Sequence, residues 1–346
     1  MFIAPRPKVN DDPYFAIRLA CAGSLALLIA FLIQSSMPML IPALTIGLMA
    51  GMRKAFDLKK AIAGPLFLII ASSFFYWLIS WLYVMPLITT LVVFFISSLA
   101  YYLTLKSGNP VGMLILISVV LMSVMGAKSA AALMIIHNGF IEGAITAMIL
   151  IPVLYGIFPS RATTPLKEVY QPDPYGQQLE RAMLRAAVLL LLLLWLYTVL
   201  DRQNMTLAIA AIFTLVFPCK EHQFEEAKER SFATLLGGLM ALLILAIIGF
   251  VGHFFILLGS TFLAILWLAN HMYHGRHPPM VYQYSISVML ALMVGALTNN
   301  APLPATLLRL VLTLSGTLGA VFLYALLESL LFKNHQFPAS RSKNPD

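Results

Sequence analysis

Long apolar runs alternate with short polar segments along almost the whole chain. A membrane-spanning helix needs roughly 20 apolar residues, so these runs predict transmembrane helices. Six runs precede the longest polar stretch, and six follow it. The first six cover Phe15 to Ile33, Met37 to Met52, Ile62 to Tyr83, Met85 to Leu105, Val111 to Ile136 and Phe140 to Phe158. The second six cover Ala182 to Leu200, Met205 to Phe217, Phe232 to Val251, Phe254 to Asn270, Met280 to Leu297 and Leu303 to Phe332.

This pattern predicts an all-α polytopic membrane protein with about 12 transmembrane helices. We expect a first six-helix unit over residues 1–158, a linker over 159–180, a second six-helix unit over 181–335 and a tail over 336–346. The linker is too short for a further folded domain.

The distribution of basic residues predicts the orientation. One set of alternate loops carries most of the Lys and Arg residues, among them Arg53, Lys60 and Lys106, whereas the opposite set has only Arg202 outside a helix. Loops rich in Lys and Arg stay in the cytoplasm during insertion. We therefore expect both termini to be cytoplasmic, in the inner membrane of a bacterium.

Composition agrees with a membrane protein and excludes a soluble one. Hydrophobic residues make up 60% of the 346 positions and charged residues 10%, and the mean hydropathy is +0.89. A soluble domain could not bury so much apolar surface. The net charge of +8 comes from scattered loop residues, so it indicates membrane topology rather than nucleic-acid binding.

An internal repeat relates the two halves. The stretch from Pro110 to Ala127 matches the stretch from Pro279 to Ala296, which lies 169 residues further along the chain. Halves of six helices each have the same orientation, so the repeat is predicted to be parallel, about an axis along the membrane normal. Several secondary transporters have this architecture.

Two predicted helices are unusually short and lie at matching places in the two halves. Pro38 and Pro42 lie at the start of the second helix, and Asn204 lies just before the eighth. Short or proline-interrupted spans in corresponding positions often border the substrate site of a transporter, because they leave backbone carbonyls free. The alternative is that these helices end early for purely structural reasons.

Three ionisable side chains lie inside predicted spans, namely Lys128, Glu142 and Arg309. Charges in the membrane are costly and often functional. The predicted spans place all three in the outer half of the bilayer, where Lys128 and Arg309 could attract an anionic substrate. Glu142, with His137 at the predicted outer end of the fifth helix, could exchange the coupling proton. Alternatively, these charges form ion pairs that only hold helices together.

Enzyme signatures are absent from the sequence. It contains no G-x-x-x-x-G-K-[ST] phosphate loop, no H-E-x-x-H and no G-x-S-x-G, so neither ATP hydrolysis nor a common hydrolase chemistry is expected. His271, His274 and His277 are regularly spaced, but no carboxylate or thiol lies near them in the sequence. We therefore expect no catalytic residue, no metal and no cofactor.

Several motifs together resemble a known family. Each half has an arginine in its first helix, Arg18 and Arg185; the ninth helix begins with the stretch from Arg230 to Gly238; and Arg309 begins the pattern R-L-x-x-T-x-x-G-x-x-G-A. The chain resembles the fusaric acid resistance and aromatic acid exporter superfamily over most of its length. It is similar to the short branch, which lacks the large cytoplasmic domain between the halves.

The resemblance implies a function. It implies proton-driven export of aromatic carboxylates or related amphiphilic compounds, with a periplasmic adaptor of the membrane-fusion type and an outer-membrane channel. It is also compatible with a homodimer. Two other functions stay open: a scaffold that transports nothing, with purely structural charges, and a lipid-modifying membrane enzyme with a cytoplasmic cluster around His222, His271 and His274.

Overall fold

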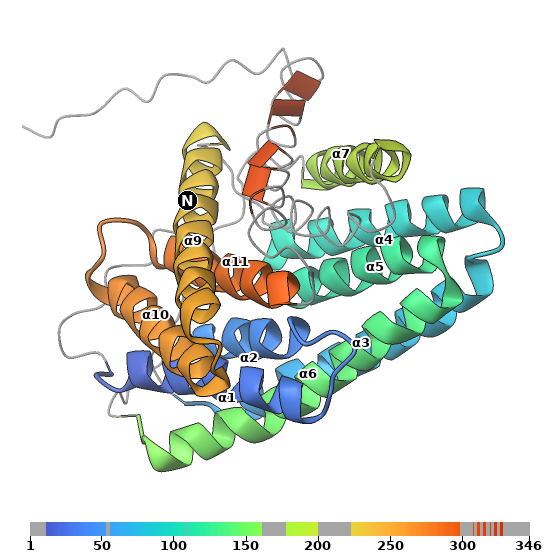
Figure 1. Ribbon diagram of the computed structural model, residues 1–346. Helices are drawn as coiled ribbons and strands as arrows, with labels where there is room; N and C mark the ends of the chain where they lie inside the picture. The colour runs from blue at the N-terminus through green and yellow to red at the C-terminus, as the bar shows by residue number, and fades with distance from the viewer. Residues whose placement is uncertain are drawn as a thin grey trace, which may run out of the picture.

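A computed structural model describes residues 12–52, 56–108, 110–160, 178–199 and 223–297, together with isolated positions between 307 and 327. Ten α-helices make up the regular structure of these residues (Figure 1). Their bounds are α1 Phe15–Leu32, α2 Leu40–Ala50, α3 Leu58–Leu82, α4 Pro86–Ser107, α5 Pro110–Lys128, α6 Ala130–Ile157, α7 Gln178–Val199, α9 Gln223–Val251, α10 Phe254–His274 and α11 Pro279–Leu297.

Within this described part, eight helices are long and apolar enough to cross a membrane: α1, α3, α4, α5, α6, α9, α10 and α11. The predicted all-α membrane protein is therefore confirmed in its class, with eight spans supported. The seventh predicted helix corresponds to α7. The eighth predicted helix, and most of the twelfth, lie outside the described residues.

Exposed apolar side chains mark the face of α3 that meets lipid. They recur every three or four residues, which places them on one side of a helix. The set is Leu66, Ile70, Phe74, Trp77 and Trp81, and Trp81 is 72% exposed. An apolar stripe of this kind is stable in a bilayer and unfavourable in water.

The boundary between the fifth and sixth helices was predicted wrongly. The fifth helix was predicted to continue to Ile136 across Lys128 and Ser129, but α5 ends at Lys128 and α6 begins at Ala130. Ser129 separates them with an extended backbone (φ −174°, ψ 158°), and its side chain accepts a hydrogen bond from the Ala132 amide, at 3.0 Å. A serine N-cap satisfies an amide that a new helix leaves free, so Ser129 starts the helix inside an apolar run.

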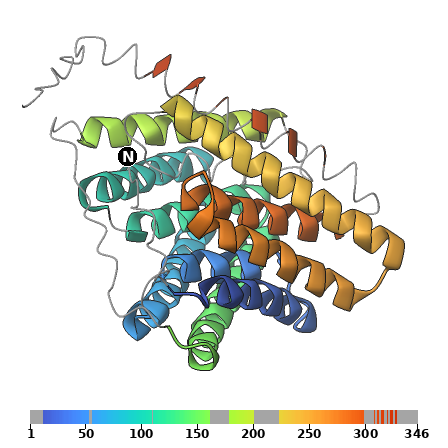
Figure 2. The ribbon, with the colours of Figure 1, turned by 90° about the vertical axis from the view of Figure 1, so that its left-hand side faces the viewer.

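Helices from distant parts of the chain pack together. α3 packs against α6, and α4 against α5, as Figure 1 shows. In the second half, α9, α10 and α11 lie side by side (Figure 2). Helices of the two halves also pack against each other. α1 packs against α10, and α7 packs against α4.

The short helix α2 lies at the centre of this arrangement. It packs against α1 and α6 of the first half and against α11 of the second. Its 11 residues extend over about 16 Å, roughly half the thickness of the hydrocarbon core. The predicted shortness of the second helix is therefore confirmed, and α2 cannot cross the membrane alone.

Glycine allows a close approach at this centre. A Cβ atom added to Gly23 of α1 would lie 2.5 Å from Ile265 Cδ1 of α10 and 2.8 Å from Ile46 Cδ1 of α2. A larger residue at this position would require both isoleucine side chains to shift. Small residues at helix contacts are a common means of close packing in membranes.

Candidate functional site

The predicted site residues fall into three groups in the structure. Pro38 lies in the connection between α1 and α2, and Pro42 lies buried in the first turn of α2. Glu142 and His137 lie on α6, and Lys128 is the last residue of α5. Asn204 and Arg309 lie outside the described residues, so their predicted roles stay predictions.

Glu142 is half-buried and has a specific partner. Ser35 Oγ donates a hydrogen bond to Glu142 Oε2 across 107 positions of sequence. The same hydroxyl accepts a hydrogen bond from the Met37 amide, at 3.2 Å. The connection between α1 and α2 is therefore held against α6 by a carboxylate.

The connection itself is tightly folded. Gln34 has a positive φ of 50°, a conformation that few residues other than glycine and asparagine adopt readily. The Ser35 amide donates to the Ala30 carbonyl, at 3.0 Å, and the Leu40 amide donates to the Met37 carbonyl, at 3.0 Å. With Pro38 between them, these bonds aim the Ser35 hydroxyl at α6 and start α2 beside Glu142.

Two glycines on α6 bring α2 close to Glu142. A Cβ atom on Gly139 would lie 3.0 Å from Met37 Cβ and 3.0 Å from Leu40 Cδ1. A Cβ atom on Gly143 would lie 2.7 Å from Leu44 Cδ1. The spacing G-x-x-x-G places both glycines on one helix face, so α2 lies directly against the α6 segment that carries the carboxylate.

His137 lies on another face of α6. Its Nε2 is 3.2 Å from Ser73 Oγ of α3, within hydrogen-bond distance. The His137 ring stacks on the ring of Tyr76, which also lies on α3, with 4.4 Å between centroids and 23° between planes. Five residues separate His137 from Glu142, so the two side chains point roughly 140° apart around the helix. The structure does not bring them together.

Lys128 and Glu142 do not share a level, contrary to expectation. Because α6 begins at Ala130, Glu142 lies about 18 Å along that helix instead of in its first turns. Lys128 is half-buried at the end of α5, beside the start of α6. No carboxylate among the described residues pairs with it.

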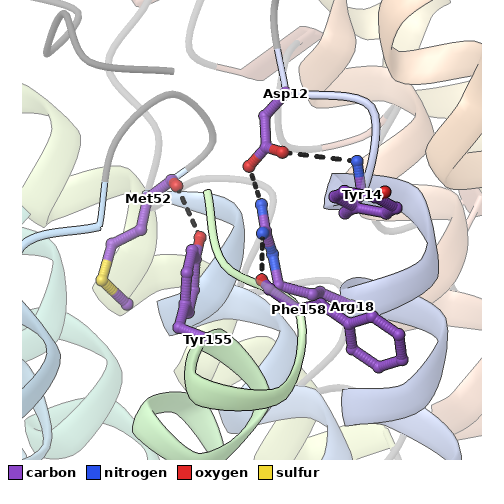
Figure 3. A network of polar contacts seen from close by, with 6 residues as sticks. All are labelled: Asp12, Tyr14, Arg18, Met52, Tyr155 and Phe158. Atoms are coloured by element: carbon purple, nitrogen blue, oxygen red, sulfur yellow. Dashed lines mark hydrogen bonds and ion pairs between the residues drawn. The ribbon is translucent and has the colours of Figure 1, made fainter. Parts of the chain in front are cut away.

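A second polar site lies where α1 begins and α6 ends (Figure 3). Arg18 is 0% exposed. One guanidinium nitrogen pairs with the Asp12 carboxylate, and the other donates to the Phe158 carbonyl, at 2.7 Å. Tyr155 donates its hydroxyl to the Met52 carbonyl just after α2, at 2.8 Å. The site therefore joins the ends of α1, α2 and α6.

Aromatic rings surround this arginine. The Arg18 guanidinium carbon lies 4.2 Å from the centre of the Tyr155 ring, a favourable cation–π geometry. Phe56 stacks on Tyr155, with 4.4 Å between centroids and 24° between planes. The sequence-based predictions gave Arg18 no functional role, since it counted only among the motifs of the family resemblance. The available signal was an arginine one turn inside an apolar run, where a charge needs a partner.

Metal-binding side chains do not gather in the described part of the chain. No group of three or more His, Cys, Asp and Glu residues there is placed to hold an ion. His271 instead lies against Trp267, with ring centroids 4.1 Å apart, and His277 against Phe232, at 4.5 Å.

Comparison with known proteins gives one match. Residues 177–323 match the family model described as fusaric acid resistance protein-like. No curated protein and no solved structure matches the chain.

Proposed function

Since residues 177–323 carry a fusaric acid resistance protein-like domain within a multi-pass membrane protein, we propose that this chain is an efflux transporter of the bacterial inner membrane. It exports aromatic carboxylates or related amphiphilic compounds. Export is driven by protons that enter the cell as the substrate leaves. Transport proteins of this kind need no catalytic residue or cofactor.

One observation carries the proposal: Glu142 is a half-buried carboxylate about midway along α6, and its partner Ser35 belongs to the connection that leads into α2. A carboxylate within a membrane-spanning helix is costly, and such groups are often functional. Protonation changes the hydrogen bond with Ser35, because the acid can donate where the carboxylate only accepts. Proton binding therefore acts directly on the position of α2.

The place of α2 supports a substrate path beside it. This helix is too short to span the bilayer, has Pro38 just before it and Pro42 in its first turn, and packs against α11 of the second half. In transporters with repeats, interrupted helices at the interface between halves border the substrate site. In our proposal Asn204 lies just before the matching short helix, the eighth.

We further propose that the two halves fold alike, as two parallel repeats, and the bounds of four helices agree with this. α5 begins at Pro110 and α11 at Pro279, while α3 ends at Leu82 and α9 at Val251. Both pairs differ by the offset of 169 found in the sequence. Matching offsets at a helix start and a helix end are expected if each half folds alike.

The contacts between the halves support the same axis. Under that offset α4 corresponds to α10, and α1 to α7. α1 packs against α10, and α7 packs against α4. A two-fold axis along the membrane normal exchanges these two contacts, so they are equivalent in the proposed arrangement.

The remaining predicted residues have secondary roles in the proposal. Lys128 and Arg309 attract the anionic substrate toward the outer side. His137 assists proton movement between α3 and α6, where it contacts Ser73. Both termini lie in the cytoplasm, and a periplasmic adaptor of the membrane-fusion type, with an outer-membrane channel, carries the substrate onward. A homodimer is compatible with this assembly.

The test is uptake of radiolabelled benzoate by inside-out membrane vesicles with an acidified lumen, compared with vesicles lacking the protein. We expect wild-type vesicles to accumulate benzoate, and Glu142→Gln to reduce accumulation at least tenfold. Glu180→Gln removes an exposed carboxylate from α7, and it should leave uptake unchanged. If Glu142→Gln inserts normally and transports like the wild type, the proposal is wrong.

A further inference from the structure

The Arg18 site contains a carboxylate that the chain itself supplies. Asp12 precedes α1, is buried, and pairs with a guanidinium that is also fully buried. It is held locally by the Tyr14 amide, which donates to Asp12 Oδ1 at 3.3 Å, and by the Phe15 amide, which donates to the Asp12 carbonyl at 3.2 Å. Asp12 therefore reaches Arg18 from a short turn rather than from the packed body of a helix.

The guanidinium has one donor that Asp12 does not use. Arg18 Nε is buried and has no hydrogen-bond acceptor among the residues that the structure describes. Arginine binds carboxylates best through two parallel hydrogen bonds, one to each oxygen. Asp12 offers one oxygen to Arg18 and turns the other toward the Tyr14 amide (Figure 3). A free carboxylate could satisfy both Nη2 and Nε.

Flat apolar surface lies beside this charge. Tyr155 and Phe56 form a stacked pair, and the guanidinium lies over the Tyr155 face. On the other side of the junction, Tyr14 lies near Phe158, with ring centroids 6.4 Å apart. A guanidinium next to aromatic rings matches a small anion with a carboxylate on a flat apolar body.

We propose that Arg18 is a binding residue for the carboxylate of the exported anion at the cytoplasmic end of the bundle, and that Asp12 occupies it in the empty state. This inference rests on the proposed function, which supplies the anion and the orientation. The substrate exchanges with Asp12, because leaving a buried guanidinium unpaired is strongly unfavourable. The site then always holds one carboxylate.

Exchange would also change the junction of three helices. Arg18 holds the Phe158 carbonyl at the end of α6, and Tyr155 beside it holds the Met52 carbonyl after α2. When a substrate displaces Asp12, the turn before α1 is released while the arginine stays paired. Substrate binding thereby frees the start of α1 at the end opposite to Ser35, which follows α1.

The experiment measures binding of benzoate to the full chain in lipid nanodiscs by calorimetry, with benzamide as the neutral analogue. We expect Asp12→Asn to bind benzoate at least tenfold more tightly than the wild type, because the internal competitor is gone. Benzamide should bind neither protein detectably. Arg18→Gln combined with Asp12→Asn replaces the ion pair by a neutral pair that can still form hydrogen bonds, and it should lose benzoate binding.

Two control variants separate charge from site. Glu180→Gln and Arg276→Gln each remove one exposed charge, and both should bind benzoate like the wild type. If Asp12→Asn binds benzoate no more tightly than the wild type, or if the double variant that melts like the wild type still binds it, the inference is overturned.

These outcomes are separate from a failure of the proposed function. If wild-type vesicles do not accumulate benzoate, yet Asp12→Asn binds it tightly and the double variant does not, the transport proposal falls and the binding site stands. If Glu142→Gln abolishes uptake while Asp12→Asn changes neither benzoate binding nor the apparent KM of uptake, the inference at Arg18 alone falls.

Discussion

The hydroxyl of Ser35 donates to the carboxylate of Glu142, and this hydrogen bond joins the turn between α1 and α2 to the middle of α6. The residues come from segments 107 positions apart. Because Gly139 and Gly143 on either side of Glu142 lie against Met37, Leu40 and Leu44, the bond and the close packing act at one place.

The Ser35 hydroxyl should matter to transport, whereas its neighbour should not. Ser35→Ala removes the donor to Glu142. A hydrogen bond to a charged group contributes about 1.5 kcal/mol or more, so we expect benzoate uptake to fall about tenfold. Ser36 is exposed, and Ser36→Ala is the matched control, expected to keep wild-type uptake. Equal rates in the two variants would contradict the role of Ser35.

The contact between α2 and α6 should tolerate no large side chain at Gly143. A Cβ atom there would already lie 3.5 Å from Ile41 Cα and 3.6 Å from the Leu40 carbonyl oxygen, so the side chain of Gly143→Leu would have no room against the backbone of α2. Overpacking of this kind costs about 1–3 kcal/mol, and the melting temperature in detergent and the uptake rate should both fall. Gly156 lies on the same helix with open space around it, so Gly156→Leu should melt close to the wild-type temperature. A Gly143→Leu protein as stable as Gly156→Leu would disprove the tight contact.

Tyr155 should contribute through its hydroxyl and through its ring separately. Tyr155→Phe loses the hydrogen bond to the Met52 carbonyl and should reduce the unfolding free energy by about 1 kcal/mol. Tyr155→Leu also loses the ring beneath Arg18, so the loss should increase by roughly 1 kcal/mol. Denaturant titration measures both values. Tyr83 is exposed, and Tyr83→Phe is the control, expected to keep the wild-type unfolding free energy. If Tyr155→Phe also leaves the unfolding free energy unchanged, the hypothesis is wrong.

The two ends of α5 should face opposite sides of the membrane. In a chain without Cys21 and Cys219, Ala131→Cys, just after α5, should react with an impermeant maleimide added to intact cells. Ser107→Cys, just before α5, should react only after the cells are opened. Both positions are exposed and lie at helix ends, so neither thiol would be buried inside the protein. Labelling in the reverse order would overturn the proposed orientation.

Helix positions could largely be predicted because a bilayer imposes length and apolarity on each span. α1 and α11 match the predicted runs within one residue at each end. α5 and α6 do not, because an apolar run in a membrane protein does not stop where one helix ends and the next begins. Lys128, in the last turn of α5, and the Ser129 cap mark that place, but two polar residues within an apolar run are a weak signal.

The candidate site could be predicted in part. The charge of Glu142 inside an apolar run pointed to it as a candidate, although its predicted depth was wrong, and the prolines pointed to the short α2. The partner Ser35 could not be inferred, because it depends on how the turn after α1 meets α6. Likewise, the network of Arg18 with Asp12 and Tyr155 depends on three helix ends converging, which one sequence does not specify. Proximity in the chain predicts that His137 and Glu142 act together, yet helical geometry separates them.

The packing of α1 on α10 and of α7 on α4 bears on how the protein is made. α1 emerges from the ribosome long before α10, which begins at Phe254, so it must wait in the lipid without its main neighbour. In a nascent first half, α1 can contact α2 and α6, but its main neighbour α10 is still missing. We expect the contact of α1 with α10 to form late in assembly, so the membrane insertion machinery would have to shield an incompletely packed α1 until translation is nearly complete.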